Sequence, residues 1–384
     1  MSPIEVSAFS LEELRTHRSE KWREFPDDVL PLPVAEMDFP VAQPIRELLI
    51  EMVSHSDLGY LGPIPEVALA FEGFAKRRWG WLLDPEQVHI VTDVGVGVVE
   101  VLRLFTSVGD RVLINTPVYH NFTSWIREAQ LEKVDVPFIK EGEGWTLDLV
   151  AVERAYESGV RAHLLCSPHN PIGYLYSRAE LTKIAELANQ HSVVVISDEI
   201  HGPLTYPEAK FVPFLSLGEV AENVGIVITA ASKAWNIAGL KCAIVVSQGP
   251  AKDALLKKLP IATHYRASLL GGFATATAYA EGGEWLDGLL NTLDSNRYLL
   301  HELLNKKIPQ ISYQVPQSTY LAWLDLGALK LGRNPSQVLL ERGKVALSPG
   351  KAFSPQSLNY ARMNFATSPE ILTEAVNRMV VAIS

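Results

Sequence analysis

Short apolar runs alternate with helical patterns through the middle of the chain. Five runs are dominated by apolar residues without strict alternation, at positions 111–115, 162–166, 193–197, 225–229 and 242–246. Such runs are typical of strands buried on both faces of a sheet. The segment 177–191 starts with Ser and carries apolar residues at helical spacing, which predicts a covering helix. This rhythm predicts an α/β fold with a mainly parallel sheet flanked by helices.

A different pattern begins near Glu284. Residues 285–307 have the periodicity of one long helix, and the runs 318–326 and 361–366 resemble strands of a smaller α/β domain. The Pro-rich stretch 26–44 resists regular structure and is expected to lie across the junction of two domains. We therefore expect an N-terminal segment (1–45) that packs with the small domain, a large domain (46–284) and a small C-terminal domain (285–384).

Composition narrows the functional classes. With 384 residues, 47% of them hydrophobic, the chain is long enough for a large core and two domains. The formal net charge of -10 leaves no broad basic surface for nucleic acid. No apolar run approaches the roughly 20 residues that cross a bilayer, and the polar N-terminus does not resemble a signal peptide. These features predict a cytoplasmic protein without a membrane or nucleic-acid partner.

Polar residues follow three of the predicted strands. Asn170 follows the run 162–166, Asp198 follows 193–197 and Lys233 follows 225–229. Alone, such an Asp is usually a helix cap and such a Lys is usually a solvated charge. In parallel sheets, however, ligands collect at the carboxyl ends of the strands. The three residues together therefore indicate a site for chemistry.

A metal site is the competing interpretation of one of these segments. His163, Cys166 and His169 recur at a spacing of three. On an extended strand this spacing directs successive members to opposite faces, so we expect no zinc site and no other metal. Cys166 and Cys242 both lie in apolar runs, where buried reduced thiols are expected and a disulfide is not.

Three motifs make a family resemblance visible. SPHNPIG (167–173), SDEIH (197–201) and ASKAWNIAGLK (231–241) occur in an order and at a spacing that resemble fold-type I pyridoxal-phosphate enzymes, the aminotransferase class I/II superfamily. The chain is more closely similar to the cystathionine β-lyase, or carbon–sulfur lyase, branch (MalY/PatB type), through LPVAEMDFP, LGY, PVYHNF, STYLAWLD, LSPGKAF and RMNF. The resemblance implies an aminotransferase-like fold, a seven-stranded sheet and pyridoxal 5'-phosphate as the cofactor.

The resemblance also assigns roles around the cofactor ring. Lys233 would carry the cofactor as a Schiff base and, once released by the substrate, remove the Cα proton. Asp198 would lie against the pyridine nitrogen and favour its protonated form. Asn170 would donate a hydrogen bond to the phenolate oxygen. Tyr119, the second predicted catalytic residue, would lie over the ring, with a core tyrosine as the alternative. His201 is a weaker candidate nearby, for which a packing role is an equal alternative.

The phosphate group needs N–H donors and positive charge, which a helix N-terminus preceded by small residues supplies. The segment TDVGVGVVEVLRLF provides such a terminus, although its GxG could equally be a plain turn. The resemblance assigns the phosphate to five residues: Val94, Gly95, Val96, Ser232 and Lys241. Lys241 stands where many relatives have Arg, which retains the charge without the bidentate fork.

Three further residues complete the predicted site. Arg362 would bind the substrate α-carboxylate through both guanidinium arms. Ala35 would assist through its backbone, in a motif where Glu36 replaces the expected Asp. Tyr60 would reach the phosphate and substrate of a neighbouring subunit, which implies a homodimer.

The resemblance therefore implies a β-lyase that cleaves cystathionine or a related cysteine S-conjugate into a thiol, pyruvate and ammonia. An aminotransferase shares the fold, the cofactor and the first proton abstraction, so it remains the alternative. A regulatory or interaction protein that retains the fold is a third possibility. The expected partner in either enzymatic case is a small amino-acid substrate.

Overall fold

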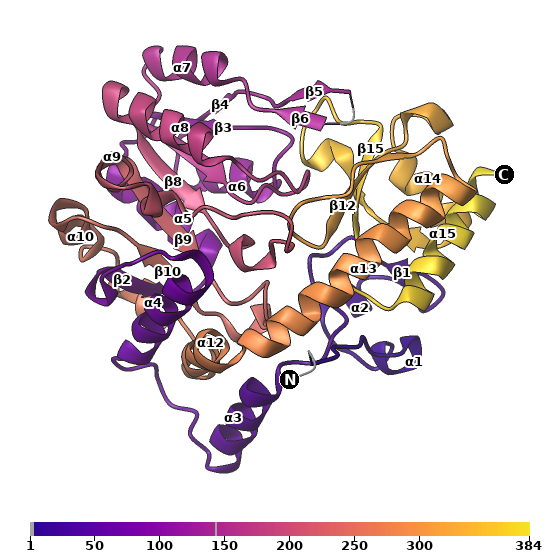
Figure 1. Ribbon diagram of the computed structural model, residues 1–384, viewed down its shortest axis with the longest axis horizontal. Helices are drawn as coiled ribbons and strands as arrows, with labels where there is room; N and C mark the ends of the chain where they lie inside the picture. Colours follow the sequence, from indigo (N-terminus) through magenta and orange to yellow (C-terminus); the bar gives the residue numbers. More distant parts are fainter. Residues whose placement is uncertain (1–3, 143) are drawn as a thin grey trace.

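A seven-stranded sheet forms the centre of the larger part of the molecule (Figure 1). The computed structural model describes residues 4–142 and 144–384. The strands lie in the order β2-β10-β9-β8-β7-β3-β4. Their bounds are β2 Val88–Val91, β3 Arg111–Ile114, β4 Glu132–Asp135, β7 Ala162–Cys166, β8 Val194–Asp198, β9 Gly225–Thr229 and β10 Ala243–Val246.

Five neighbouring strands, from β4 to β9, run parallel, and β10 is antiparallel to both β9 and β2. The five strands predicted from apolar runs are all present, and the predicted α/β fold is confirmed. The two edge strands were not predicted. In β4 the sequence Glu-Lys-Val-Asp is exposed or only half-buried, so it carries no buried-strand pattern. An edge strand borders solvent and therefore tolerates such polarity.

Both faces of the sheet are covered by helices, which explains why its strands lack alternation. Leu164 packs in a core with residues of α5, α6 and α10, while its neighbour Leu165 packs in the core of the opposite face, with residues of α4, α7, α8, α9 and α12. These helices span α4 Pro65–Trp79, α5 Val94–Phe105, α6 Asn121–Glu128, α7 Leu149–Glu157, α8 Arg178–His191, α9 Glu219–Val224, α10 Pro250–Leu256 and α12 Leu269–Glu281.

The predicted helix at 177–191 is confirmed as α8. Its N-cap Ser177 accepts a hydrogen bond from the N–H of Glu180, and the Glu180 side chain accepts from the N–H of Ser177 in return. This reciprocal capping box satisfies two N–H groups that a helix start leaves without partners. The remaining helices of this part are α3 Gln43–Ser54 and α11 Ile261–Tyr265, and a hairpin joins β5 Ile139–Glu141 to β6 Gly144–Thr146.

The smaller part contains an antiparallel sheet in the order β11-β12-β15-β14. The long predicted helix is α13, and both predicted C-terminal strands are present as β12 and β15. The elements are α13 Gly283–Lys307, α14 Pro335–Gly343, α15 Pro369–Ile383, β11 Ser312–Tyr313, β12 Leu321–Asp325, β13 Val345–Ala346, β14 Ser348–Pro349 and β15 Tyr360–Asn364. The domain boundaries at residues 45 and 284 remain a prediction.

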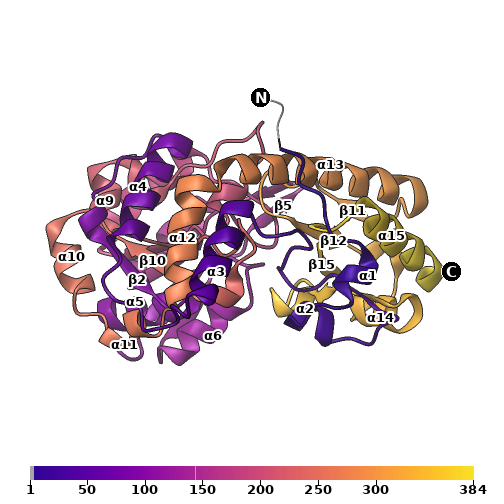
Figure 2. The ribbon, with the colours of Figure 1, turned by 90° about the horizontal axis from the view of Figure 1, so that it is seen from below.

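The N-terminal segment, with α1 (Leu11–Leu14) and α2 (Glu20–Arg23), lies on the side of this smaller part (Figure 2). Within the Pro-rich stretch, β1 (Leu30–Pro31) pairs in parallel with β13. The stretch is otherwise irregular, as its prolines predict. Backbone pairing thus ties the start of the chain to a strand more than 300 residues later.

Two further properties follow from the described residues. None of the helices in 4–142 and 144–384 is both long and apolar enough to span a bilayer. Cys166 and Cys242 are buried free thiols, as predicted.

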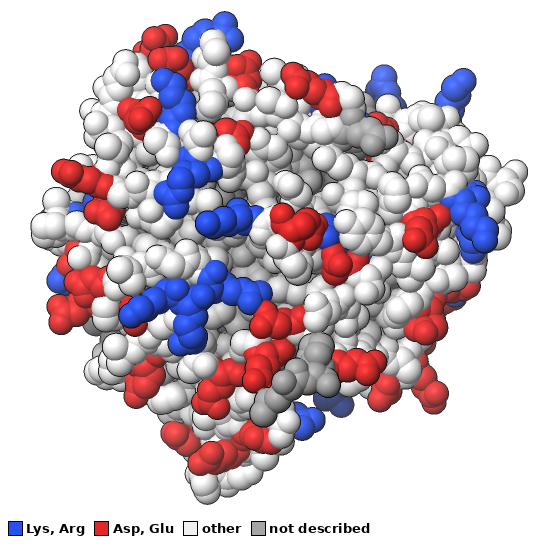
Figure 3. Space-filling view, viewed as in Figure 1, with Lys and Arg blue, Asp and Glu red and all other residues white. Residues whose placement is uncertain are grey.

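On the face drawn in Figure 3, basic side chains gather toward the centre left with acidic side chains on either side of them.

Candidate active site

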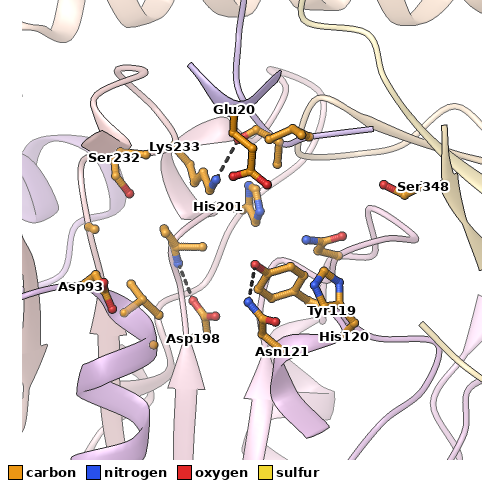
Figure 4. Close-up of a pocket in the computed structure, with 18 of the residues that line it drawn as sticks. Glu20, Asp93, Tyr119, His120, Asn121, Asp198, His201, Ser232, Lys233 and Ser348 are labelled. Carbon is orange, nitrogen blue, oxygen red and sulfur yellow. Dashed lines mark hydrogen bonds between the residues drawn. The ribbon is translucent and has the colours of Figure 1, made fainter. Parts of the chain in front are cut away.

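A cavity of about 830 Å³ opens where the carboxyl ends of β7, β8 and β9 face the smaller part and the N-terminal segment (Figure 4). Twelve of the predicted site residues line it, and only Tyr60 does not. The twelve are Ala35, Val94, Gly95, Val96, Tyr119, Asn170, Asp198, His201, Ser232, Lys233, Lys241 and Arg362. Residues from distant parts of the chain therefore converge on one space, as the strand-end argument predicts.

Asp198 is the last residue of β8 and is 5% exposed. Its Oδ1 accepts a hydrogen bond of 3.2 Å from the N–H of Ile200. Burial raises the pKa of Asp198 to about 7, against the lowering effects of that N–H and of the Lys233 charge. Among the described residues no cation forms an ion pair with this carboxylate, so it is suited to a ligand that brings a proton or positive charge.

Lys233 lies beyond the end of β9 and is half-buried. Its Nζ donates a hydrogen bond of 2.7 Å to the carbonyl oxygen of Ala35. Burial, and next the charge of Arg362, lower the pKa of Lys233 to about 8. A substantial fraction of this amine is therefore neutral near pH 8, as a nucleophile or general base requires.

Arg362 stands in the middle of β15, between β12 and β14, and is 3% exposed. Its Nη1 donates to Asn170 Oδ1 at 3.0 Å, and its Nη2 donates to the Pro33 carbonyl oxygen at 2.7 Å. Nε has no partner among the described residues. Burial lowers the pKa of Arg362 to about 10, which still leaves it a cation at neutral pH. A buried guanidinium with an unused N–H can bind a carboxylate.

Asn170 is fixed by the same contact. Because its Oδ1 accepts from Arg362, its Nδ2 is the part of the amide that remains to donate to a ligand. The carbonyl oxygen of Asn170 also accepts the N–H of Tyr119 at 3.0 Å. This bond links the turn after β7 to the turn after β3, two strands that are neighbours in the sheet.

Tyr119 presents an aromatic ring to the cavity. Its hydroxyl oxygen accepts a hydrogen bond of 2.8 Å from Asn121 Nδ2, and its ring meets Trp125 edge-on at 5.8 Å between centroids. Burial raises the pKa of Tyr119, so the phenol stays neutral at physiological pH. Asn121 and Trp125 were not predicted, although both lie within or just after the PVYHNF motif.

The N-terminus of α5 lines the end of the cavity that is predicted to bind the phosphate. A Cβ added to Gly95 would lie 2.9 Å from Trp125 Nε1, so only glycine leaves this space open. Asp93, which was not predicted, is the N-cap: its Oδ1 accepts the N–H of Val96 at 2.9 Å and its Oδ2 pairs with Lys241 Nζ at 3.1 Å. Of the three predicted backbone donors, Val94 and Gly95 therefore remain available, because Val96 already donates to Asp93.

His201 lies in the same cavity but is not joined to Asp198 by any hydrogen bond in the described structure. It is 3% exposed and meets Tyr320 edge-on at 6.1 Å, while its Nδ1 has no partner among the described residues. Burial lowers the pKa of His201 to about 3, so the imidazole is neutral. Its buried free nitrogen is compatible with contact to a ligand.

Tyr60 lies elsewhere. It belongs to the loop between α3 and α4, is 89% exposed and contributes nothing to the cavity of its own chain.

His163, Cys166 and His169, which were weighed as a zinc site, are buried in the core, where both histidines contact protein oxygen atoms. His163 Nδ1 and Nε2 are each 2.7 Å from an oxygen, that of the Tyr156 hydroxyl and that of the Asn115 side chain. His169 Nε2 is 3.1 Å from the Asn115 carbonyl oxygen. Both nitrogens of His163 are thus occupied by protein groups.

The donor set fits a planar anionic cofactor that has a basic ring nitrogen. It offers an amine, a buried carboxylate and, at the far end, a helix N-terminus with a lysine. The model of the family "aminotransferase class I and II" matches residues 28–379. The chain belongs to this family. The predicted aminotransferase-like fold is confirmed with it.

Individual relatives specify the branch. The chain is 36% identical to the cystathionine β-lyase of Corynebacterium glutamicum, over 96% of this chain and 98% of the relative. It is 31% identical to the cystathionine β-lyase PatB of Bacillus subtilis, over 93% of each chain. The solved structure of cystalysin from Treponema denticola, which contains pyridoxal 5'-phosphate, superposes with a TM-score of 0.92 at 28% identity and covers 100% of this chain and 99% of its own. The predicted β-lyase branch is confirmed.

Proposed function

We propose that this aminotransferase-family protein is a pyridoxal-phosphate-dependent carbon–sulfur β-lyase. It cleaves cystathionine or related cysteine S-conjugates into a thiol, pyruvate and ammonia. The observation that carries the proposal is that Lys233, Asp198 and Arg362 converge on one cavity with the protonation behaviour that the reaction needs. The names of relatives at 31–36% identity support the same reaction.

When bound, the cofactor supplies an electron sink for the pair left at the substrate Cα. Side chains of the protein bind and orient the substrate and move the proton. Arg362 binds the α-carboxylate, which fixes the Cα–H bond relative to Lys233. The Lys233 amine removes that proton, and its pKa of about 8 suits a base that works near neutral pH. Loss of the thiol from Cβ follows, and one water molecule then hydrolyses the three-carbon remainder to pyruvate and ammonia.

Asp198, Asn170 and Tyr119 act on the cofactor ring. The carboxylate of Asp198 holds a proton on the ring nitrogen; burial raises the pKa of Asp198, and a positive partner stabilises the charged form of a buried carboxylate. Asn170 donates through Nδ2, the half of its amide that Arg362 leaves free. Tyr119 stacks on the ring, and His201 packs beside it. At the phosphate end, the free N–H groups of Val94 and Gly95 act with Ser232 and Lys241, while the N–H of Val96, the third predicted donor, is held by Asp93.

The active unit is proposed to be a homodimer in which Tyr60 reaches the neighbouring site. Its 89% exposure leaves it free for another subunit. Exposed apolar side chains surround the same segment: Ile50 and Val53 on α3, and Leu58 two residues before Tyr60, are each more than half exposed. Several exposed apolar residues within one segment are consistent with a surface for association. The proposed compartment is the cytoplasm, which agrees with two free buried thiols.

The test is a pyruvate and free-thiol assay on purified holoprotein with L-cystathionine, run beside keto-acid-dependent transamination. We expect equal amounts of thiol and pyruvate without added keto acid. Product that forms only when a keto acid is supplied would make the protein an aminotransferase. Tight cofactor binding without turnover of any amino acid would favour the regulatory alternative.

A further inference from the structure

The N-terminal segment contributes an acidic wall to the cavity. Glu20, at the start of α2, and Glu24, directly after it, both line the cavity together with the neighbouring Phe25. The two carboxylates are four residues apart, so they share one side of the helical turn. Figure 4 shows the Glu20 side chain entering the cavity over the side that holds Lys233 and His201. None of these three N-terminal residues has a role in the proposed reaction.

The short helix α2 is held rigidly in this position. Lys21 and Asp38 form an ion pair of 2.7 Å and both side chains are fully buried. Trp22 Nε1 donates to the same Asp38 at 3.0 Å. Because two consecutive residues of α2 are anchored inward, Glu20 and Glu24 on its other side face the cavity. Because Lys21 is paired with Asp38, it does not neutralise the charges of Glu20 and Glu24.

None of the Lys and Arg residues that line the described cavity belongs to its N-terminal wall. Lys241 lies at the N-terminus of α5, Arg362 lies on β15, and Lys233 lies at the sheet edge; no other Lys or Arg lines the described cavity. Buried polar atoms without partners, Arg362 Nε and His201 Nδ1, independently indicate that a ligand occupies this space. Burial raises the pKa of Tyr119, and the nearby charge of Glu20 acts in the same direction.

The proposed roles of Arg362 and Lys233 orient the substrate in the cavity. Its α-carboxylate lies against Arg362 and its Cα near Lys233, while the sheet edge with Asp198 forms the floor. The group on sulfur therefore extends away from the sheet, toward the N-terminal wall. We propose that Glu20 and Glu24 select cysteine S-conjugates whose sulfur substituent ends in a cationic group over those whose substituent ends in a carboxylate; cystathionine, whose distal end carries both an ammonium and a carboxylate, lies between these two. This inference rests on the proposed β-lyase function.

Three substrates of similar size test the selection. S-(2-aminoethyl)-L-cysteine ends in a cation, S-propyl-L-cysteine is neutral and S-carboxymethyl-L-cysteine ends in an anion. For the wild-type holoenzyme we expect kcat/KM to fall in that order. Exposed ion pairs are weak, so each carboxylate should change the cation-to-anion ratio by about fivefold. The ratio should also shrink as ionic strength rises.

The variants are Glu20→Gln, Glu24→Gln and the double change, with Glu12→Gln as the matched control. Glu12 lies on α1, is exposed and does not line the cavity, so its replacement should leave the ratio unchanged. In the double variant, kcat/KM for the cationic and the anionic substrate should both lie close to the value for the neutral substrate, so that the cation-to-anion ratio approaches one. Calorimetric binding of the same pair to cofactor-loaded Lys233→Ala protein gives a readout that does not depend on turnover.

The outcomes separate the two proposals. The proposed charge selection alone would be overturned by either of two results. In the first, the wild type cleaves all three conjugates with equal kcat/KM. In the second, the double variant has the same cation-to-anion ratio as the wild type. Absence of cleavage of every conjugate by the wild type would overturn the proposed function, and the selection with it.

Discussion

Two walls of the cavity differ in how the chain builds them. The sheet wall consists of Asp198, which is paired in the strand ladder, and of Asn170 and Lys233, which follow β7 and β9; all three are buried or half-buried. The N-terminal wall consists of Glu20, Glu24 and the irregular segment around Ala35, in which both carboxylates are exposed. Burial raises the pKa of Asp198 to about 7 and lowers that of Lys233 to about 8.

This difference separates chemistry from selection. Burial penalises charge, so it can tune an acid or a base by several pKa units, whereas solvent around an exposed carboxylate screens its field. The sheet wall can therefore control reaction steps, and the N-terminal wall can only bias which substrate enters. Changes in the sheet wall should have large effects on kcat, and changes at the periphery should have small effects on affinity.

The largest effect is expected from Asp198→Asn, which removes the buried charge and keeps the shape. We expect kcat to fall about 100- to 1000-fold, because stabilisation of charge that develops in the transition state is lost. Steady-state rates, with cofactor occupancy measured by absorbance, check this. A loss explained by lower occupancy alone, or a loss of less than threefold, would contradict a direct role for the carboxylate.

A smaller effect is expected from Arg362→Lys. The substitution keeps the charge but loses the planar fork, so kcat/KM should fall about 10- to 150-fold, the range for one or two hydrogen bonds to a charged group. The defect should disappear with a decarboxylated substrate analogue, for which wild type and variant should differ little. An equal defect with that analogue would show that Arg362 instead supports Asn170, to which it donates.

The pH dependence of cofactor uptake reports on Lys233. Only the neutral amine attacks an aldehyde, and the lowered pKa of about 8 means that this form appears at lower pH than for an ordinary lysine. The rate at which apoprotein captures pyridoxal phosphate should therefore rise about tenfold per pH unit up to about pH 8 and then level off. A rate that continues to rise toward pH 10 would indicate an unperturbed amine.

The smallest effect is expected from Asp93→Asn at the phosphate end. The amide oxygen can still accept the Val96 N–H, while the negative charge beside Lys241 is removed. Pyridoxal phosphate should bind about two- to fivefold more tightly to apoprotein, which is the scale of a charge at a helix N-terminus. Pyridoxal without phosphate is the control and should bind equally to both proteins. Weaker phosphate binding by the variant would mean that Asp93 positions Lys241 productively.

The sequence predicts the sheet wall better than the N-terminal wall, for a physical reason. Residues that follow buried apolar runs must lie at one edge of a parallel sheet, so Asn170, Asp198 and Lys233 are brought together by pattern alone. The edge strand β4 was not predicted from the sequence, because its residues Glu-Lys-Val-Asp are exposed or half-buried and form no apolar run. The Asp93 cap has a detectable signal, an Asp directly before an apolar helical run.

Glu20 has no such signal. Its position depends on the buried Lys21–Asp38 pair within the N-terminal segment and on the pairing of β1 with β13, and the second of these contacts joins segments that are far apart in the sequence. Local patterns describe single elements, whereas this wall exists only after the ends of the chain have met. The same limit explains why Trp125, which fills the space above Gly95, was not predicted.

The central claim is that Lys233 carries the cofactor, and borohydride trapping tests it most directly. Reduction of the holoprotein converts a lysine–cofactor C=N bond into a stable adduct that proteolysis and mass spectrometry can locate. The account predicts the phosphopyridoxyl mass on the peptide that contains Lys233, and its loss in Lys233→Ala. A label on Lys241, the other lysine that lines the cavity, or no label on a protein that still turns over substrate, would contradict it.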